Sequence, residues 1–179
     1  MLEWKAVLAS FAILATPFIL LFFEGKKNIK RELCLGKFEW RKHIPTGMRL
    51  FLFSFCVMFL EAIILGALGF LDSEKIAVII NNQPMLMLIV AVTLGPIGEE
   101  LLFRGYLVPR IGVVFSSVLF ALFHYGYGSV SEIAAALTVG VILGLHVRKH
   151  KDVYSCIIAH AAYNAFSIII VLSSTGVAP

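Results

Sequence analysis

The sequence contains few charged residues. Aspartate, glutamate, lysine and arginine together make up 15% of the chain, whereas hydrophobic residues make up 60%. Soluble globular domains carry roughly 25% charged and about 45–50% apolar residues. The shortage of charge excludes an ordinary soluble domain and predicts an integral membrane protein. With 179 residues, the chain is expected to form a single transmembrane domain, residues 1–179.

Cysteine is also scarce, and no internal repeat is visible. Cys34, Cys56 and Cys156 are an odd number without the spacing of a metal site, so we expect reduced thiols rather than a disulfide framework. The absence of an inverted repeat argues against many transporter folds. The net charge of +4 comes from basic residues in short loops between apolar runs, which indicates membrane orientation and no nucleic-acid partner.

Six apolar runs predict an all-α, polytopic transmembrane helical bundle. A helix needs about 20 apolar residues to cross a membrane. The expected spans are residues 6–23, 48–70, 85–106, 111–125, 130–147 and 153–172. The first run is longer than the apolar part of a signal peptide and lacks a small-residue cleavage site, so we expect it to be retained. Residues 72–83 are expected to form a loop with at most one amphipathic turn, and Gly140 and Gly144 predict a close helix contact.

The basic residues predict an orientation. Of the 15 lysine and arginine residues, all but Lys5 and Lys75 fall on one set of loops and helix ends. Such residues concentrate on the cytoplasmic side of a membrane protein. Both termini are therefore expected on the non-cytoplasmic side, in the cell membrane. His43, His146 and His150 lie among the basic loops and are expected to be solvated.

Polar side chains inside the predicted spans point to one site. Such groups are costly in a membrane and usually mark function. At about 1.5 Å of rise per residue, four of them lie roughly 10–20 Å from the basic end. They come from three helices and are Glu99, His124, His160 and Asn164. Glu61 has a comparable depth, and it can support the site, conduct protons or pair with a histidine.

The two adjacent glutamates are expected to differ in role. Glu100 and Arg104 are four residues apart and share a helix face, where they can pair. Glu99 lies about 100° around the helix and is left free, which suits a general base. The alternative is that both glutamates only hold helices together. Pro96 and the neighbouring glycines predict a break in the helix, with backbone groups facing a water-lined cavity.

The other polar residues can assist a hydrolytic reaction. His160 and Asn164 share a face of the last span, and together they can donate hydrogen bonds to an oxyanion. A helix-to-helix hydrogen bond is the alternative for this pair. His124 follows Phe120 by four residues, so the ring can wall the imidazole while the imidazole helps Glu99 to bind water. A histidine that only packs in the core is the alternative.

These residues form three motifs that resemble those of the CAAX-protease and bacteriocin-processing family, also called the Abi family, and in particular its type II CAAX prenyl endopeptidases. The motifs are EExxxR (Glu99, Glu100, Arg104), FxxxH (Phe120, His124) and HxxxN (His160, Asn164). All three occur in the family's order and each lies in a predicted span. The resemblance covers residues 94–168, the expected catalytic core.

The resemblance implies an intramembrane endopeptidase. Its substrate would be a membrane-associated protein, such as one prenylated at a CAAX terminus, cut near the C-terminus or within a membrane segment. Glu99 and His124 would activate the attacking water, while His160 and Asn164 would stabilise the oxyanion. Glu100 would hold the site together with Arg104.

The cofactor and the activity have alternatives. The family is often classed as metalloproteases, and Glu99, His124 and His160 can supply a zinc site with an open position for water. No HExxH motif is present, and a metal-free glutamate mechanism needs only the same residues. The main alternative function is a catalytically silent bacteriocin-immunity or scaffolding protein, and a proton-coupled transporter is a third. Substrate recognition is expected from the cavity and from the basic face, which suits contact with membrane lipid. The sequence indicates neither the substrate nor the oligomeric state.

Overall fold

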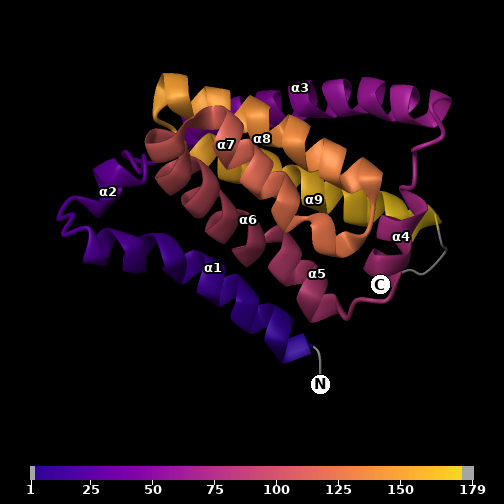
Figure 1. The fold of residues 1–179 in the computed structure, drawn as a ribbon, viewed down its shortest axis with the longest axis horizontal. Helices are drawn as coiled ribbons and strands as arrows, with labels where there is room; N and C mark the ends of the chain where they lie inside the picture. Colours follow the sequence, from indigo (N-terminus) through magenta and orange to yellow (C-terminus); the bar gives the residue numbers. More distant parts are fainter. Residues whose placement is uncertain (1–2, 175–179) are drawn as a thin grey trace.

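The computed structural model describes residues 3–174, with side chains from residue 7 onward, and this part of the chain contains helices and no strand (Figure 1). The elements, in chain order, are α1 (Glu3–Phe23), α2 (Ile29–Glu32), α3 (Trp40–Ala67), α4 (Glu74–Asn81), α5 (Met85–Val92), α6 (Leu94–Glu99), the π-helix η1 (Glu100–Leu107), α7 (Val108–Phe123), the 3₁₀ turn η2 (Tyr125–Tyr127), α8 (Val130–His150) and α9 (Tyr154–Ser174).

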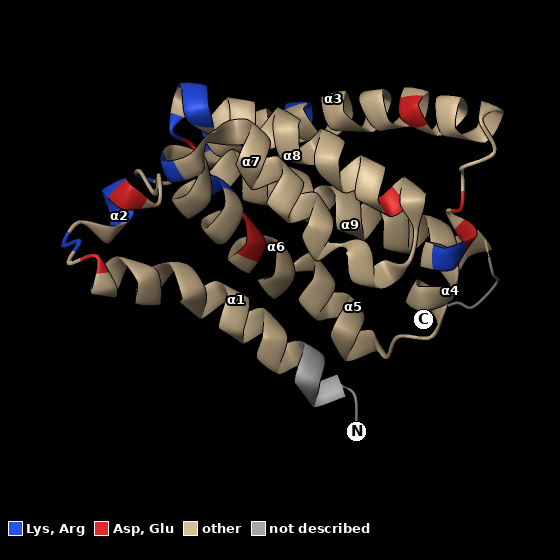
Figure 2. Ribbon diagram, in the orientation of Figure 1, with Lys and Arg blue, Asp and Glu red and all other residues tan. Residues whose placement is uncertain are grey.

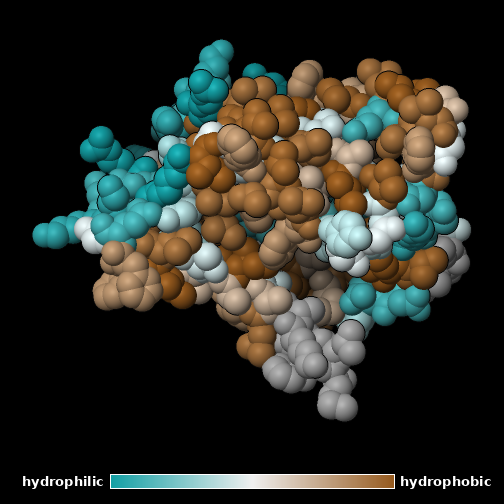
Figure 3. Space-filling model, viewed as in Figure 1, coloured by the Kyte–Doolittle hydropathy of each residue, from teal (hydrophilic) through white to brown (hydrophobic). Residues whose placement is uncertain are grey.

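The outside of the bundle is apolar. Phe22, Phe53 and Phe115 are among the large side chains that point outward, and hydrophobic residues dominate the middle of the face in Figure 3. Within the described part, α3, the run Met85–Tyr127, α8 and α9 are long and apolar enough to cross a membrane, and Val7–Phe23 is a shorter apolar helix. Apolar side chains on the outside of such helices are suited to contact with the lipid tails of a membrane. The prediction of an all-α polytopic bundle is therefore confirmed.

The run from Met85 to Tyr127 folds back on itself at Gly112. This glycine has a φ of 82°, which a residue with a side chain rarely adopts. On the far side of the turn, the Ser116 hydroxyl donates to the Phe103 carbonyl at 2.6 Å, and the Phe103 and Phe120 rings meet edge to face. The run thus forms two legs, which correspond to the third and fourth predicted spans.

Small residues allow α8 to lie close to α7. A Cβ at Gly140 would stand 3.0 Å from the Ser117 side chain, and a Cβ at Gly144 would stand 2.9 Å from Val113. Contacts shorter than about 3.4 Å leave no room for a side chain without movement of a neighbour. The predicted close contact at this glycine pair is therefore confirmed, and it fixes α7, which carries His124 at its end.

Basic side chains gather at one end of the bundle, around α2, the start of α3 and the end of α8 (Figure 2). Arg110 joins this end together, since its guanidinium donates to Glu24 at 2.6 Å and to Glu32 at 3.2 Å. The hydrogen bond from Arg110, assisted by one from Tyr106, lowers the pKa of Glu24 to about 2. Arg104 lies apart from the basic end and is only 1% exposed.

Several local predictions need correction. α3 begins at Trp40, well before the predicted start of the second span, and much of residues 72–83 forms α4. His43 and His146 were predicted to be solvated, but His43 is buried and His146 is half-buried. His150 is exposed, as predicted. Cys34, Cys56 and Cys156 are free thiols, also as predicted.

The two inward-facing histidines meet Asp152, in the turn between α8 and α9. His146 Nε2 lies 3.2 Å and His43 Nε2 lies 3.7 Å from its carboxylate. Ser155 adds its hydroxyl at 2.6 Å and its backbone N–H at 3.1 Å. Burial alone would raise the pKa of Asp152, but hydrogen bonds from His146 and Ser155 outweigh it and lower that pKa. This cluster fixes the start of α9, the helix that carries the last site residues.

Candidate active site

The chain breaks its helix just before the glutamate pair. α5 ends at Val92, and Thr93 leaves the helical region with a ψ of −83°. Pro96 follows, and it has no N–H to continue the ladder of helical hydrogen bonds. The carbonyl of Ala91, freed by this break, accepts a hydrogen bond from the Asn164 amide at 2.8 Å. The predicted break therefore connects directly to a predicted site residue.

Glu100 lies in the first turn of the π-helix and is fully buried. Its carboxylate meets the Arg104 guanidinium at 2.9 Å, and His160 Nδ1 also lies 2.9 Å from it. The Arg104 guanidinium in turn stacks over the Phe120 ring at 4.0 Å. The predicted pairing of Glu100 with Arg104 is present, and it holds the imidazole of α9 against η1. π-helical turns of this kind occur often at functional sites.

Glu99 has a different environment from its neighbour. Its Oε2 lies 3.9 Å from His160 Nε2 and, among the described residues, has no hydrogen-bond partner. The side chain is 18% exposed and lines a cavity. The structure thus separates the two carboxylates as the helix geometry predicted, one within an ion pair and one facing open space.

The hydrogen bonds of the two histidines fix which ring nitrogen faces the cavity. His124 Nδ1 lies 2.9 Å from the Phe120 carbonyl, which can only accept, so Nδ1 carries a proton. In the neutral ring, Nε2 is then an acceptor for a water proton. His160 Nδ1 likewise donates to Glu100, so its Nε2 donates only when the ring is an imidazolium. The Phe120 ring lies 4.6 Å from the His124 ring and walls it, as predicted.

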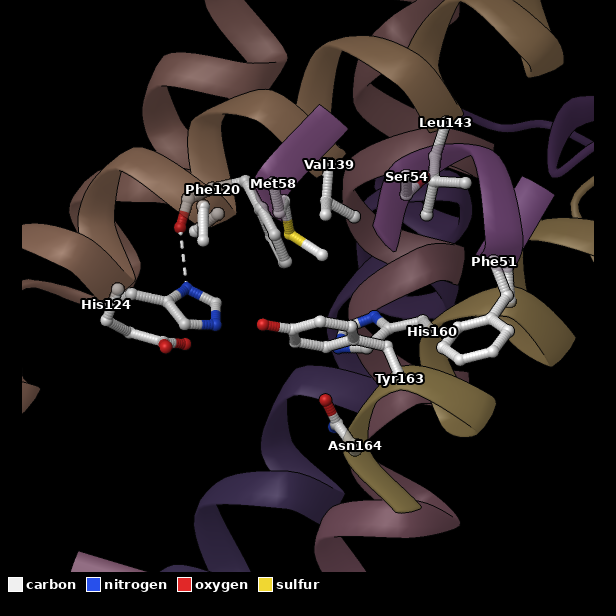
Figure 4. Close-up of a pocket in the computed structure, with 14 residues that line it drawn as sticks. Phe51, Ser54, Met58, Phe120, His124, Val139, Leu143, His160, Tyr163 and Asn164 are labelled. Carbon is white, nitrogen blue, oxygen red and sulfur yellow. Dashed lines mark hydrogen bonds between the residues drawn. The ribbon is translucent and has the colours of Figure 1, made fainter. Parts of the chain in front are cut away.

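The site residues line two connected spaces within the bundle. The smaller has a volume of about 30 Å³, and His124, His160 and Asn164 contribute to its wall (Figure 4). A space of this size can hold a water molecule between polar groups. The larger has a volume of about 600 Å³ and adds Glu99 to the same three residues. The four predicted catalytic side chains therefore meet at one cavity.

Three further polar residues at this cavity were not identified as site residues from the sequence. Tyr163, Glu132 and Tyr127 all line the larger space. Tyr163 lies inside the HxxxN motif, and its hydroxyl points toward His124 in Figure 4. Its position between two motif residues was an available signal. Glu61, whose role was left open, lines the same space and accepts a hydrogen bond from Thr138 at 3.2 Å, so it is not the partner of a histidine.

The donor atoms of the site are of the types that bind metal ions. Among the described side chains, no group of three histidine, cysteine, aspartate or glutamate residues has a geometry suited to a metal ion. His124 and His160 each commit Nδ1 to a neighbour, which leaves only their Nε2 atoms and Glu99 for such a role. A carboxylate and two imidazole nitrogens are ligand types that zinc accepts, and the same three groups can also bind a water molecule directly.

Comparisons with known proteins agree with the geometry. Residues 81–166 match the sequence model of a family described as Type II CAAX prenyl endopeptidase Rce1-like. Comparison with curated proteins and with solved structures gives no match. The matched segment contains the four residues that line the cavity, Glu99, His124, His160 and Asn164, together with Glu100, which binds His160. Residues 81–166, slightly less than half of the chain, are therefore similar to the Type II CAAX prenyl endopeptidase Rce1-like family.

Proposed function

We propose that this chain is an intramembrane endopeptidase that cleaves a membrane-associated substrate near its C-terminus or within a membrane segment. The match of residues 81–166 to this family supports a CAAX-type protease. The observation that carries the more specific proposal is the unpaired Glu99 carboxylate beside His160, at a cavity that also contains His124.

The reaction follows from the positions of these groups. Glu99 accepts a proton from a water molecule that is held also by the acceptor Nε2 of His124, and the resulting hydroxide attacks the scissile carbonyl. The oxyanion that forms is stabilised by the imidazolium of His160 and by the second N–H of Asn164, whose first N–H is already bound to Ala91. The protonated Glu99 then donates to the leaving amine as the C–N bond breaks.

The orientation is part of the proposal. The basic end of the bundle faces the cytoplasm, where it contacts anionic lipid, and both termini lie on the other side. A cysteine introduced at the exposed Lys149 should then react with a membrane-impermeant thiol reagent only after cells are opened. Reaction in intact cells would reverse the orientation.

The test of activity uses purified protein in detergent and a set of quenched fluorescent peptides, a prenylated CAAX peptide among them. Glu99→Gln keeps the shape of the side chain but removes the base, so a loss of at least about 100-fold is expected. Glu74→Gln is the matched control, because Glu74 is exposed on α4 and is not among the residues that line the cavity. Equal turnover by both variants would contradict the assignment of Glu99. Binding of peptides without any cleavage would instead favour a silent immunity or scaffolding protein.

A further inference from the structure

Glu132 has a sequence context that suggests a purely structural role. It lies three residues after Ser129, at the start of α8, and this spacing is that of a capping box. In a capping box the serine accepts from the glutamate N–H, and the glutamate side chain returns a hydrogen bond to the serine N–H. The first half is present, since Ser129 Oγ accepts from Glu132 N at 3.2 Å.

The second half of the capping box is missing, and a residue from another segment binds the start of α8. Asp72, from the loop after α3, accepts from the backbone N–H of Val130 at 3.0 Å and of Ser131 at 2.9 Å. It also accepts from the Ser129 hydroxyl at 2.8 Å. The backbone N–H of Ser131, together with its hydroxyl, holds the pKa of Asp72 well below its ordinary value. Glu132 is thus not needed as a cap.

The Glu132 carboxylate instead faces the catalytic space. Glu132 lines both the smaller and the larger cavity, together with His124 and His160. It is half-buried, and its side chain makes no hydrogen bond or ion pair with another residue in the part of the chain that the structure describes. Glu99 and His160 are near enough to act on it electrostatically. The Glu132 carboxylate is therefore partly shielded from bulk water, and no hydrogen bond or ion pair from a described residue compensates for the lost hydration.

The cavity offers this carboxylate no lysine or arginine. Its described lining includes the carboxylates of Glu61, Glu99 and Glu132 but no lysine or arginine side chain. Arg104, the buried cation nearest in the chain to Glu99, is committed to Glu100. A bound group that carries a positive charge would therefore offset the free energy that is needed to keep an ionised carboxylate away from bulk water at this depth.

The three carboxylates are not equally available to such a group. Glu99 is required at the scissile carbonyl in the proposed reaction, and Glu61 is held by Thr138 through Oε1, with only its Oε2 left without a partner among the described residues. Glu132 has neither duty. We propose that Glu132 selects substrates that place a lysine or arginine side chain beside the scissile bond, a specificity that rests on the proposed protease function.

The test measures cleavage of matched peptides that differ at one position. Lysine, norleucine or glutamate is placed in turn at each of the three positions on either side of the scissile bond. At one of these positions the wild-type protein should cleave the lysine peptide with a kcat/KM at least about tenfold above that of the norleucine peptide, as fits a hydrogen bond to a charged group. In Glu132→Gln this ratio should fall to within about threefold, and Glu132→Lys should favour the glutamate peptide.

Control variants separate Glu132 from the general charge of the cavity. Glu132→Asp, which keeps the charge, should retain part of the preference, and the exposed Glu74→Gln should retain all of it. A wild-type ratio near one at every position, with cleavage that still depends on Glu99, would overturn the role of Glu132 and leave the protease function standing. A preference that is lost in Glu61→Gln but kept in Glu132→Gln would also overturn it.

A binding measurement covers the case in which none of these peptides is cleaved. Fluorescence anisotropy of the labelled lysine and norleucine peptides then compares their affinities for the wild-type protein and for Glu132→Gln. If the wild-type protein binds the lysine peptide about tenfold more tightly than the norleucine peptide, and Glu132→Gln does not, the selection by Glu132 is supported. Equal affinities would overturn it, whatever the outcome for catalysis.

Discussion

Removal of one partner from the buried pair of Glu100 and Arg104 should destabilise the fold more than removal of both. The guanidinium is 1% exposed and the carboxylate 0%, and they meet at 2.9 Å. Glu100→Gln leaves the guanidinium with the Phe120 ring as its remaining close contact. Arg104→Met leaves the carboxylate with His160, its second partner. Glu100→Gln should therefore be the more damaging of the two changes.

The size of the effect follows from the burial of the pair. Loss of one partner of a buried ion pair typically costs about 3–5 kcal/mol, because the other charge is left without compensation. Replacement of both charges by groups of similar volume is often close to neutral. The double variant, Glu100→Gln with Arg104→Met, should therefore lose much less unfolding free energy than the sum of the losses in the two single variants. The difference, which is the coupling energy, should be at least about 2 kcal/mol.

The assay is reversible unfolding of the purified protein in mixed micelles with increasing dodecyl sulfate, followed by helical circular dichroism. Glu24→Gln and Arg110→Met form the matched control cycle, because their ion pair lies on the more exposed basic end, and a much smaller coupling is expected there. Additive effects in the Glu100–Arg104 cycle would refute the reasoning, as would equal, small losses in both single variants.

Three further outcomes are expected. Gly144→Leu should lower the thermal unfolding midpoint by forcing α8 from Val113, a cost of about 1–3 kcal/mol or more, seen in a melt of the purified protein. Because the pKa of Asp152 is lowered in the fold, its ionised form stabilises the protein fully above about pH 4 and less as the pH falls further. Asp152→Asn should therefore reduce the fall in melting temperature between pH 5 and 3. An unchanged pH dependence of the melting temperature would contradict this. Finally, the proposed reaction, in which Glu99 and His124 activate water directly, predicts that a strong chelator leaves peptide cleavage intact, and a loss that zinc restores would show that the site uses metal.

The polar residues of the site were predictable because a membrane makes them conspicuous. Charged or polar groups at depth are costly, so Glu99, His124, His160 and Asn164 stood out from apolar helices without any structural information. The division between Glu99 and Glu100 was equally accessible, because adjacent residues on a helix point about 100° apart. What followed from periodicity and cost was therefore predicted well.

Other features depend on contacts between segments distant in the chain. His43 and His146 were expected at the surface because their neighbours are basic, but both side chains point into the protein, where they contact the Asp152 carboxylate. Glu132 lies three residues after Ser129, a spacing that local sequence explains as a capping box, and only the contacts of Asp72 with the start of α8 show a different arrangement. Local sequence does not carry such information.

The π-helix η1 also limits how this site can change over time. A π-helical turn contains more residues than an α-helical turn, so deletion of one residue between Glu100 and Leu107 would let the segment return to an ordinary α-helix. The helical segments on either side would keep their relative orientation, because the wide turn already accommodates the extra residue, but the residues inside the turn would take new positions. A deletion between Glu100 and Arg104 would change their spacing and so break the pair that holds His160 in place. The loss of one residue in this turn would therefore damage the site while leaving the rest of the run in register.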